Sequence, residues 1–149
     1  MLADVDLLFV RSVTKVNAEL LDDTPVRFVA TATAGTDHID HDYLAAHNIG
    51  FSDALGSNAN SVAEYVTAAL LILAETHSLD LSSLSIGVIG VGHVGSLVVE
   101  KARALGMSVV MNDPPRERRE PAFSSAPLAD VLACDVVSVH TPLTHDGPD

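Results

Sequence analysis

The chain has 149 residues, the length of one ordinary domain, and 48% of them are hydrophobic, which is enough to build a core. The formal net charge is −12 and only 8 residues are Lys or Arg, so no nucleic-acid partner is expected, because few side chains can neutralise phosphates. The sequence has one cysteine, no apolar run of membrane-span length and no basic leader, and it therefore predicts a soluble cytoplasmic protein with no internal disulfide and no membrane partner.

The first 57 residues alternate short apolar runs with helical patterns. Three strands are predicted, at Val5–Val10, Arg27–Thr31 and Ile49–Ser52. Two short helices, each opened by an Asn or Asp cap, are predicted between them, at Asn17–Leu21 and Asp40–His47. Strands that alternate with helices indicate a parallel sheet with crossover helices.

A break in periodicity follows, at "DALGSNANS". Beyond it, Ser61–Thr76 predicts a long helix that is apolar on nearly every side. Such a helix is expected to be buried between two masses rather than to lie on a surface. We therefore place a domain junction near Asn58, with one domain over residues 1–57 and a second, opened by the long helix, over residues 58–149.

The second region continues the same alternation. Three further strands are predicted, at Ser85–Ile89, Ser108–Asn112 and Val136–Val139, and two helices, at Val94–Leu105 and near Pro127–Leu132. The polar stretch "PPRERREPAFSS" is expected to be a loop. The whole pattern predicts an α/β fold of parallel sheets with crossover helices.

A glycine pattern, G-x-G-x-x-G, lies between a predicted strand and a predicted helix, and it includes His93 and Val94. Gly90 allows a sharp turn, Gly92 allows the backbone to approach a pyrophosphate, and Gly95 allows the helix to pack close to the strand. The N–H groups and the dipole at the helix start then favour phosphate. We predict a dinucleotide site here; the alternative is a glycine-rich turn without a ligand.

Asp113 ends the next strand, about 20 residues beyond the glycines, where a carboxylate can accept hydrogen bonds from ribose hydroxyls. Pro114 biases it toward an extended backbone. The alternative is a solvated loop residue. Three nearby arginines, Arg116, Arg118 and Arg119, raise the possibility of NADP. The carboxylate would repel a ribose phosphate, so NAD is the favoured cofactor.

Polar residues also follow two neighbouring strands of the first region. They are Arg11, Ser12 and Lys15 after one strand, and Thr31, Thr33, Gly35 and Thr36 at the end of the next. Loops that leave the carboxyl ends of neighbouring parallel strands converge on ligands. Cationic groups, hydroxyls and glycine N–H groups suit a carboxylate or a phosphate. The residues alone leave open the alternative of solvated loops with capping hydroxyls.

Three other features favour structural roles. His38 and His41 alternate with aspartates in "TDHIDHD", which resembles a metal site, but acids are also typical of a first helical turn, so no metal is expected. His140 ends a strand where a cofactor can lie, but a lone histidine is no catalytic triad. Cys134 is expected to be a small core residue.

Several of these motifs together resemble the D-isomer-specific 2-hydroxyacid dehydrogenase superfamily: "VRSVTKVN", "ATAGTDHID", "GFSDALGSNANSVAEYV", "IGVIGVGHVG", "NDPPR" and "HTPL". The resemblance implies part of a flavodoxin-like substrate domain joined to part of a Rossmann NAD-binding domain. It also implies a cytoplasmic homodimer that oxidises 4-phospho-D-erythronate at C2 with NAD. The product would be 3-hydroxy-2-oxo-4-phosphooxybutanoate, in pyridoxal phosphate (vitamin B6) biosynthesis.

The resemblance also implies roles for individual residues. Ser12 and Thr33 would contact the substrate. The glycine loop, Asp113 and Thr141 would hold NAD. The family's catalytic arginine, glutamate and histidine match no position here, so we expect an inactive fragment that lacks both ends of a two-domain dehydrogenase. The alternatives are a non-catalytic dinucleotide-sensing module and an adenosyl-cofactor enzyme such as a methyltransferase.

Overall fold

The computed structural model describes residues 2–141, and the chain divides into two compact units, Met1–Ser57 and Asn58–Asp149. Each unit is described by itself. In this part of the chain, no helix combines the length and the apolar character needed to cross a membrane.

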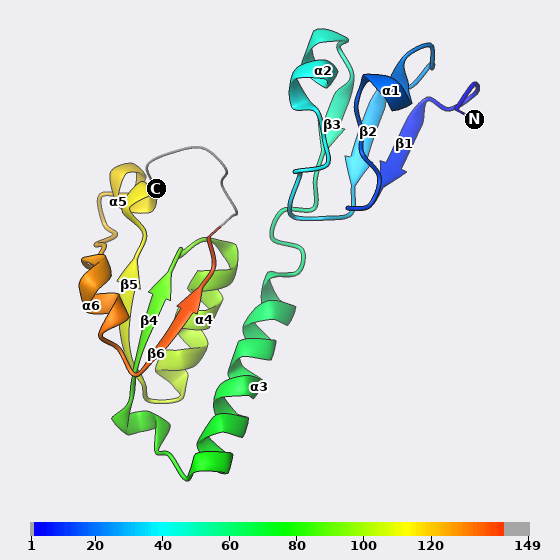
Figure 1. Cartoon of the computed structure of the whole chain (residues 1–149). Coiled ribbons are helices and arrows are strands. Elements are labelled where there is room, and N and C mark those ends of the chain that lie inside the picture. The colour runs from blue at the N-terminus through cyan, green and yellow to red at the C-terminus, as the bar shows by residue number, and fades with distance from the viewer. Residues whose placement is uncertain (1, 142–149) are drawn as a thin grey trace. The chain divides into compact units, whose positions relative to one another are not determined.

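The first unit is a three-stranded parallel sheet with short helices (Figure 1). Its elements are β1 Leu7–Val10, α1 Ala18–Leu21, β2 Phe28–Thr31, α2 His41–Ala46 and β3 Gly50–Ser52. The strands lie in the order β1-β2-β3. Both predicted caps are confirmed, because the Asn17 side chain accepts a hydrogen bond from the Leu20 N–H and the Asp40 side chain accepts one from the Tyr43 N–H.

The second unit holds the longer elements of the chain. They are α3 Ala59–His77, a 3-10 turn Leu81–Ser83, β4 Ser85–Ile89, α4 His93–Ala104, β5 Ser108–Asn112, α5 Pro114–Arg119, α6 Leu128–Leu132 and β6 Val136–Val139. The three strands are parallel and lie in the order β5-β4-β6. The α/β fold with parallel sheets is therefore confirmed in both units.

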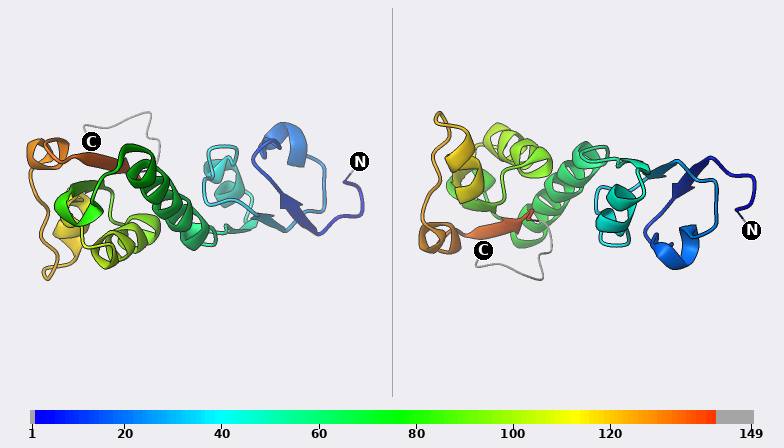
Figure 2. Two further views of the ribbon diagram at one scale, coloured as in Figure 1. Left: turned by 90° about the horizontal axis from the view of Figure 1, so that it is seen from below. Right: turned by 90° about the horizontal axis from the view of Figure 1, so that it is seen from above.

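Helices cover both faces of this second sheet (Figure 2). On one face, Ile86 and Val88 are completely buried in a core that includes Val98 of α4. On the other face, a Cβ added at Gly87 would lie 2.4 Å from the Val131 carbonyl oxygen of α6. Successive residues of a strand face opposite sides, so α4 and α6 pack on opposite faces of β4. Burial of both faces is typical of a parallel sheet.

One helix of the second unit was not predicted, and another is less buried within this unit than its composition suggests. Residues 114–119 form the helix α5 and not a loop. Asp113 caps its first turn and Pro114 begins it, which is the usual start of a helix and outweighs the polar composition. Within the second unit, the long helix α3 is not covered on every side, since Tyr65 is 75% exposed and Ile72 is 62% exposed. Within its unit, α4 packs against only one side of α3, where Ala63 and Leu70 are buried.

The prediction that Cys134 is a core residue was also wrong. Its side chain is only half-buried, and the thiol lies 3.6 Å from the Asp130 carbonyl oxygen, at the end of α6. The residue of α6 that fills the core is Val131, which is completely buried. Only one side of this five-residue helix faces the sheet, and Cys134 lies two residues after the helix ends.

Candidate functional site

The glycine loop, residues 90–95, leaves β4 between the carboxyl ends of the sheet's neighbouring strands. Gly90 has a φ of 80°, which favours glycine. A Cβ at this position would lie 2.8 Å from the His140 carbonyl oxygen and 3.0 Å from the Thr141 Cγ2. The loop therefore touches the segment that follows β6. Because β5 and β6 lie on opposite sides of β4, this is a point where the strand order reverses, which is where ligands bind in open α/β sheets.

The other two glycines have opposite surroundings. A Cβ at Gly95 would lie 2.0 Å from the Gly90 carbonyl oxygen, so only glycine lets α4 pack this closely. A Cβ at Gly92 would meet nothing within 4 Å. Gly92 is the N-cap of α4 and no side chain caps this helix. His93 and Val94, which begin α4, follow at this uncapped end, so the open space beside Gly92 lies where helix N–H groups can bind an anion.

Asp113 lies beside this loop, at the end of β5. Its Oδ2 accepts a hydrogen bond from the Val91 N–H at 2.8 Å, and its Oδ1 accepts one from the Arg116 N–H at 2.8 Å. The Asp113 N–H donates to the Ser125 Oγ at 2.9 Å. Each carboxylate oxygen can accept more than one hydrogen bond, so both can also accept from a ligand's hydroxyl groups.

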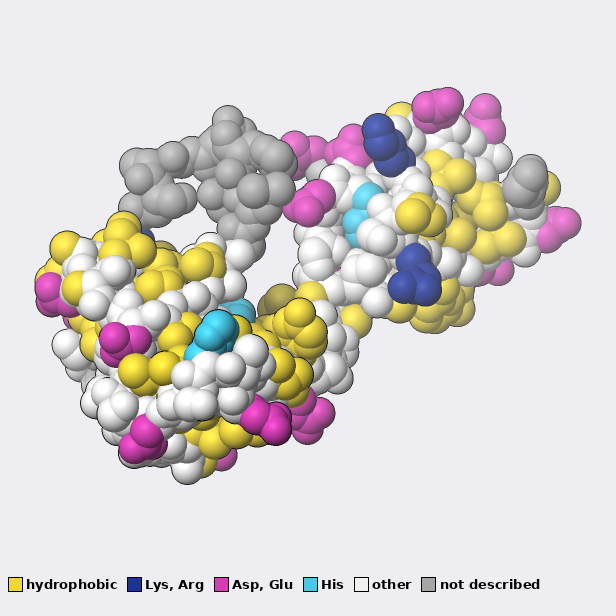
Figure 3. Space-filling view, turned by 60° about the horizontal axis from the view of Figure 1, so that its bottom comes forward, with side chains coloured by type: hydrophobic (Ala, Val, Ile, Leu, Met, Phe, Trp, Pro, Cys, Tyr) yellow, Lys and Arg dark blue, Asp and Glu magenta, His cyan; other side chains and the backbone are white. Residues whose placement is uncertain are grey.

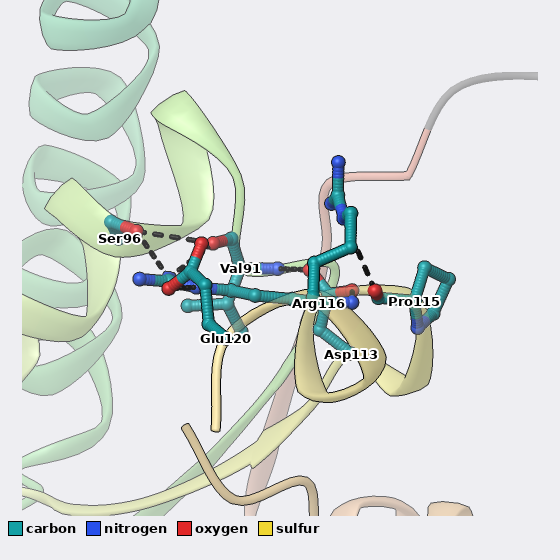
Figure 4. A network of polar contacts seen from close by, with 7 residues as sticks. Val91, Ser96, Asp113, Pro115, Arg116 and Glu120 are labelled. Carbon is teal, nitrogen blue, oxygen red and sulfur yellow. Dashed lines mark hydrogen bonds and ion pairs between the residues drawn. The ribbon is translucent and has the colours of Figure 1, made fainter. Parts of the chain in front are cut away.

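Two of the arginines that raise the possibility of NADP, Arg116 and Arg119, form hydrogen bonds within the protein, and Figure 4 shows those of Arg116. The Arg116 guanidinium donates to the Val91 carbonyl oxygen, to the Ser96 Oγ and to Glu120. The Arg119 Nε donates to the Pro115 carbonyl oxygen at 3.2 Å. These contacts compete with any contact to a ribose phosphate.

His140 follows β6 at the same edge of the sheet, and its Nε2 lies 2.8 Å from the Ser138 Oγ. Burial lowers the pKa of His140 from its ordinary value, because the charged imidazolium loses contact with water. Burial therefore favours the neutral form of the imidazole. Thr141 next to it is exposed, and its side chain faces Gly90.

A second candidate site lies in the first unit, at the carboxyl ends of β1 and β2. It is an open pocket of about 410 Å³, lined by Ser12, Val13, Lys15, Thr33, Gly35, Asp37 and His38. The two loops that form it are joined by a parallel bridge between Val16 and Ile39, both of which are buried. The structure thus brings Ser12 and Thr33 into the lining of one pocket, and its volume is in the range of small-molecule sites.

A chain of hydrogen bonds runs from His38 to Thr33. Thr33 donates its only hydroxyl proton to the Gly35 carbonyl oxygen at 2.7 Å, so it must accept from Thr31, 2.7 Å away. Thr31 has then used its own proton, and it must accept from the His38 Nε2, 3.0 Å away. The network therefore assigns a proton to the His38 Nε2 and leaves a lone pair on Thr33.

The cationic groups of this region remain available to a ligand. Neither Arg11 nor Lys15 forms an ion pair with any described residue, and the Ser12 hydroxyl makes no hydrogen bond within the same part of the chain. Figure 3 shows Lys or Arg side chains and a histidine on one face of this unit, at the right of the view. Asp37, which also lines the pocket, partly offsets this positive charge.

The histidines of "TDHIDHD" have structural partners. His38 belongs to the threonine network, and the His41 ring packs edge-on against Phe51 with centroids 4.9 Å apart. Within residues 2–141, no group of three or more His, Cys, Asp and Glu side chains is arranged to hold a metal ion.

Sequence reasoning missed two of these interactions. The sequence pattern around His38 indicates only a metal ligand or a helix start, whereas its contact with Thr31 depends on how the loop after β2 folds back. The sequence around Arg116 suggests only a contact with NADP, whereas its contact with Val91 joins residues 25 positions apart. The one local signal was Asp113 followed by Pro114, which predicts that a helix starts there and brings Arg116 back to the loop.

One family model and several curated proteins match this chain over nearly its whole length. The family model described as "D-isomer specific 2-hydroxyacid dehydrogenase, catalytic domain" matches residues 1–141. The erythronate-4-phosphate dehydrogenase of Hydrogenovibrio crunogenus is 50% identical over 148 residues, 99% of this chain and 40% of that protein. The enzyme of the same name from Salinibacter ruber is 51% identical over 152 residues, 99% of this chain and 39% of that protein. The chain therefore spans about 40% of the length of these curated relatives.

A solved structure is similar as well. The crystal structure of D-lactate dehydrogenase from Aquifex aeolicus, in complex with NAD and lactic acid, matches with a TM-score of 0.77 and 28% identity. The match covers 96% of this chain and 50% of that one.

Proposed function

Because the chain belongs to the D-isomer specific 2-hydroxyacid dehydrogenase family, we propose that it supplies the NAD site and part of the substrate site of a 4-phospho-D-erythronate dehydrogenase. The observation that carries this proposal is the 50% identity to an erythronate-4-phosphate dehydrogenase over 99% of the chain. The reaction is the oxidation of a phosphorylated 2-hydroxy acid at C2, giving 3-hydroxy-2-oxo-4-phosphooxybutanoate for the synthesis of pyridoxal phosphate (vitamin B6).

The cofactor end of the proposal is supported by the geometry of the glycine loop. The open space at Gly92, the uncapped start of α4 and the close packing at Gly90 form a cradle that fits a pyrophosphate. Asp113 would accept hydrogen bonds from the ribose hydroxyls and disfavour a ribose phosphate, so NAD is preferred to NADP. When bound, NAD accepts the hydride that leaves C2 of the substrate.

Thr141 and the first residues of α4, His93 and Val94, complete the proposed cofactor site. Thr141 is exposed next to Gly90, where its hydroxyl can contact a bound dinucleotide. The Aquifex aeolicus D-lactate dehydrogenase, whose fold is similar over 96% of this chain, was solved with NAD bound. The strand order of the second unit reverses at the carboxyl end of β4, and this supports a NAD site beside the glycine loop in this chain.

The substrate end of the proposal rests on the pocket of the first unit. Ser12 can donate a hydrogen bond to an anionic oxygen, and Thr33 has a lone pair that can accept one from a substrate hydroxyl. Lys15 in the lining, and Arg11 beside Ser12 in the chain, supply positive charge for a carboxylate or a phosphate. A phosphorylated hydroxy acid carries the carboxylate, the phosphate and the hydroxyl that these side chains would bind.

We also propose a homodimer in the cytoplasm. The resemblance to cytoplasmic, homodimeric enzymes of this superfamily supports both points, and one cysteine without a disulfide partner fits a reducing compartment. Sedimentation analysis of the purified protein tests the oligomeric state.

Calorimetric titration of the purified chain with NAD, NADP and 4-phospho-D-erythronate tests the main proposal. We expect NAD to bind more tightly than NADP, and we expect 4-phospho-D-erythronate to bind more tightly than D-lactate, which lacks the phosphate. Binding of NAD without any binding of the phosphorylated acid would instead favour a dinucleotide-sensing module. A chain that binds neither ligand would contradict the proposal.

A further inference from the structure

Val91 is the residue of the glycine loop that joins the loop to the core. Its side chain is 2% exposed and packs in the hydrophobic core of the second unit. Its N–H and its carbonyl oxygen are both hydrogen-bonded to side chains. The N–H donates to Asp113, and the carbonyl oxygen accepts from Arg116 and from Ser96. The backbone of the loop at this point therefore depends on side chains for its partners.

Two of these three partners belong to the start of α5. Asp113 is the N-cap of α5, and its Oδ1 accepts a hydrogen bond from the Arg116 N–H at 2.8 Å. The same turn thus places a carboxylate against the Val91 N–H and a guanidinium against the Val91 carbonyl oxygen, as Figure 4 shows. The two peptide groups that flank Val91 are therefore each hydrogen-bonded to a charged side chain, one to a carboxylate and the other to a guanidinium.

The Arg116 side chain is itself held in place. Its Nη1 donates to the Val91 carbonyl oxygen at 2.6 Å and to the Ser96 Oγ at 3.1 Å, while its Nε donates to Glu120 at 2.8 Å. The guanidinium carbon lies 4.6 Å from the centroid of the Phe123 ring. The side chain is 26% exposed. Only a planar group with several donors can make all of these contacts at once.

We propose that Arg116 is a positioning residue for the glycine loop, which it holds through the Val91 carbonyl oxygen in the shape that receives the dinucleotide. The proposal rests on the proposed function in one respect, that the loop binds NAD. Its physical basis is preorganisation, since a loop that is ordered before binding loses less conformational freedom when the ligand arrives. Glu120 and Phe123 contribute by orienting the guanidinium.

The test compares variants of Arg116 with a matched variant on the same helix. Arg116→Met keeps an unbranched side chain that reaches about as far as the arginine Nε, but it removes every donor and the guanidinium that lies over Phe123. Arg116→Lys keeps one charged donor, which can restore the bond to the Val91 carbonyl oxygen but not the bond to Glu120 as well. Arg119→Met is the control, because Arg119 is exposed on α5 and has no contact with the loop among the described residues.

Two measurements on each purified variant separate a local effect from a general loss of structure. The first is the NAD dissociation constant. The second is the hydrogen-exchange rate of the Val91 amide, with the amides of Ile86 and Val88 in β4 as internal references. For Arg116→Met we expect about tenfold weaker NAD binding and about tenfold faster exchange at Val91, which is about 1.4 kcal/mol in each case. Exchange at Ile86 and Val88 should not change.

Arg116→Lys should recover part of the NAD affinity, and Arg119→Met should match the wild type within about twofold in both measurements. NAD affinity within twofold of wild type in Arg116→Met would overturn the inference. So would equally faster exchange at Val91, Ile86 and Val88, because Arg116 would then stabilise the whole unit and not the loop. If Arg116→Met does not fold, Arg116→Lys is compared with wild type on the same two criteria.

A wild-type chain that binds no NAD would contradict the proposed function. In that case the exchange rate at Val91 would still decide whether Arg116 holds the loop, since this measurement needs no ligand.

Discussion

Two glycines of the same loop should respond in opposite ways to the addition of one methyl group. Gly92→Ala and Gly95→Ala make the same chemical change three residues apart. The Cβ would lie in open space at Gly92 and 2.0 Å from the Gly90 carbonyl oxygen at Gly95. We expect the first variant to fold normally and to bind NAD poorly, and we expect the second to be unstable.

The magnitudes follow from these surroundings. At Gly95 the backbone would have to separate by 1.0 Å to reach the 3.0 Å that is the lower limit for real Cβ contacts. Such overpacking costs about 2–3 kcal/mol. For a unit the size of residues 58–149, a loss of this kind lowers the melting temperature by roughly 8–20 °C.

At Gly92 the backbone φ of −82° is negative, and the added Cβ would meet no atom within 4 Å. The change in stability should therefore stay within about 1 kcal/mol. A methyl group at this position would separate a pyrophosphate from the N–H groups of α4. Loss of one charge-assisted hydrogen bond corresponds to roughly 10- to 100-fold weaker binding.

Thermal unfolding followed by circular dichroism and titration with NAD measure the two effects. Wild-type NAD affinity in Gly92→Ala would show that no pyrophosphate approaches this residue. A melting temperature equal to that of wild type in Gly95→Ala would refute the close packing of α4 on the loop.

Four further substitutions have definite expected outcomes. Asp113→Ala should narrow the preference for NAD over NADP, measured by titration with both, and an unchanged ratio would rule out a contact with the ribose. Ser12→Ala and Thr33→Val should each weaken binding of 4-phospho-D-erythronate about tenfold while NAD affinity stays the same, and equal loss of both ligands would indicate misfolding instead. Asp135→Asn should reduce stability at pH 7, because hydrogen bonds from the Ser85 hydroxyl and N–H lower the pKa of Asp135 below its ordinary value of 3.8. A depressed pKa contributes stability above pH 3.8 that is lost as the pH falls through the folded-state pKa. The difference in melting temperature between Asp135→Asn and wild type should therefore shrink below pH 3.8, and a constant difference from pH 7 to pH 3 would contradict this.

The local elements of this chain could be predicted where apolar runs and capping residues agreed. The strands β4, β5 and β6 begin and end at the predicted residues, and the caps Asn17 and Asp40 start the predicted helices. Strand formation by a buried apolar run and capping by a nearby side chain both involve neighbours in sequence. The helix α5 was missed because its polar composition was given more weight than its cap.

The parts of the site that were predicted are also local. The glycine spacing and Asp113 were found because the strand–turn–helix unit that uses them is continuous in sequence. The approach of Ser12 to Thr33 followed from the general rule that neighbouring parallel strands bring their loops together, and the pocket in the structure has both in its lining. The roles of His38 and Arg116 were not predicted, since each depends on a contact whose existence no spacing indicates.

The sequence alone determined the alternation of strands and helices, the turn at Gly90 and the residues that we predict to contact phosphate and ribose. Only the tertiary structure decided where β6 lies in the sheet, which side of α3 is buried, and that Val91 is held by Asp113 and Arg116. The physical reason is that propensity, capping and turn geometry act over a few residues. Strand order, burial and side-chain contacts between distant segments depend instead on how whole elements share a limited core.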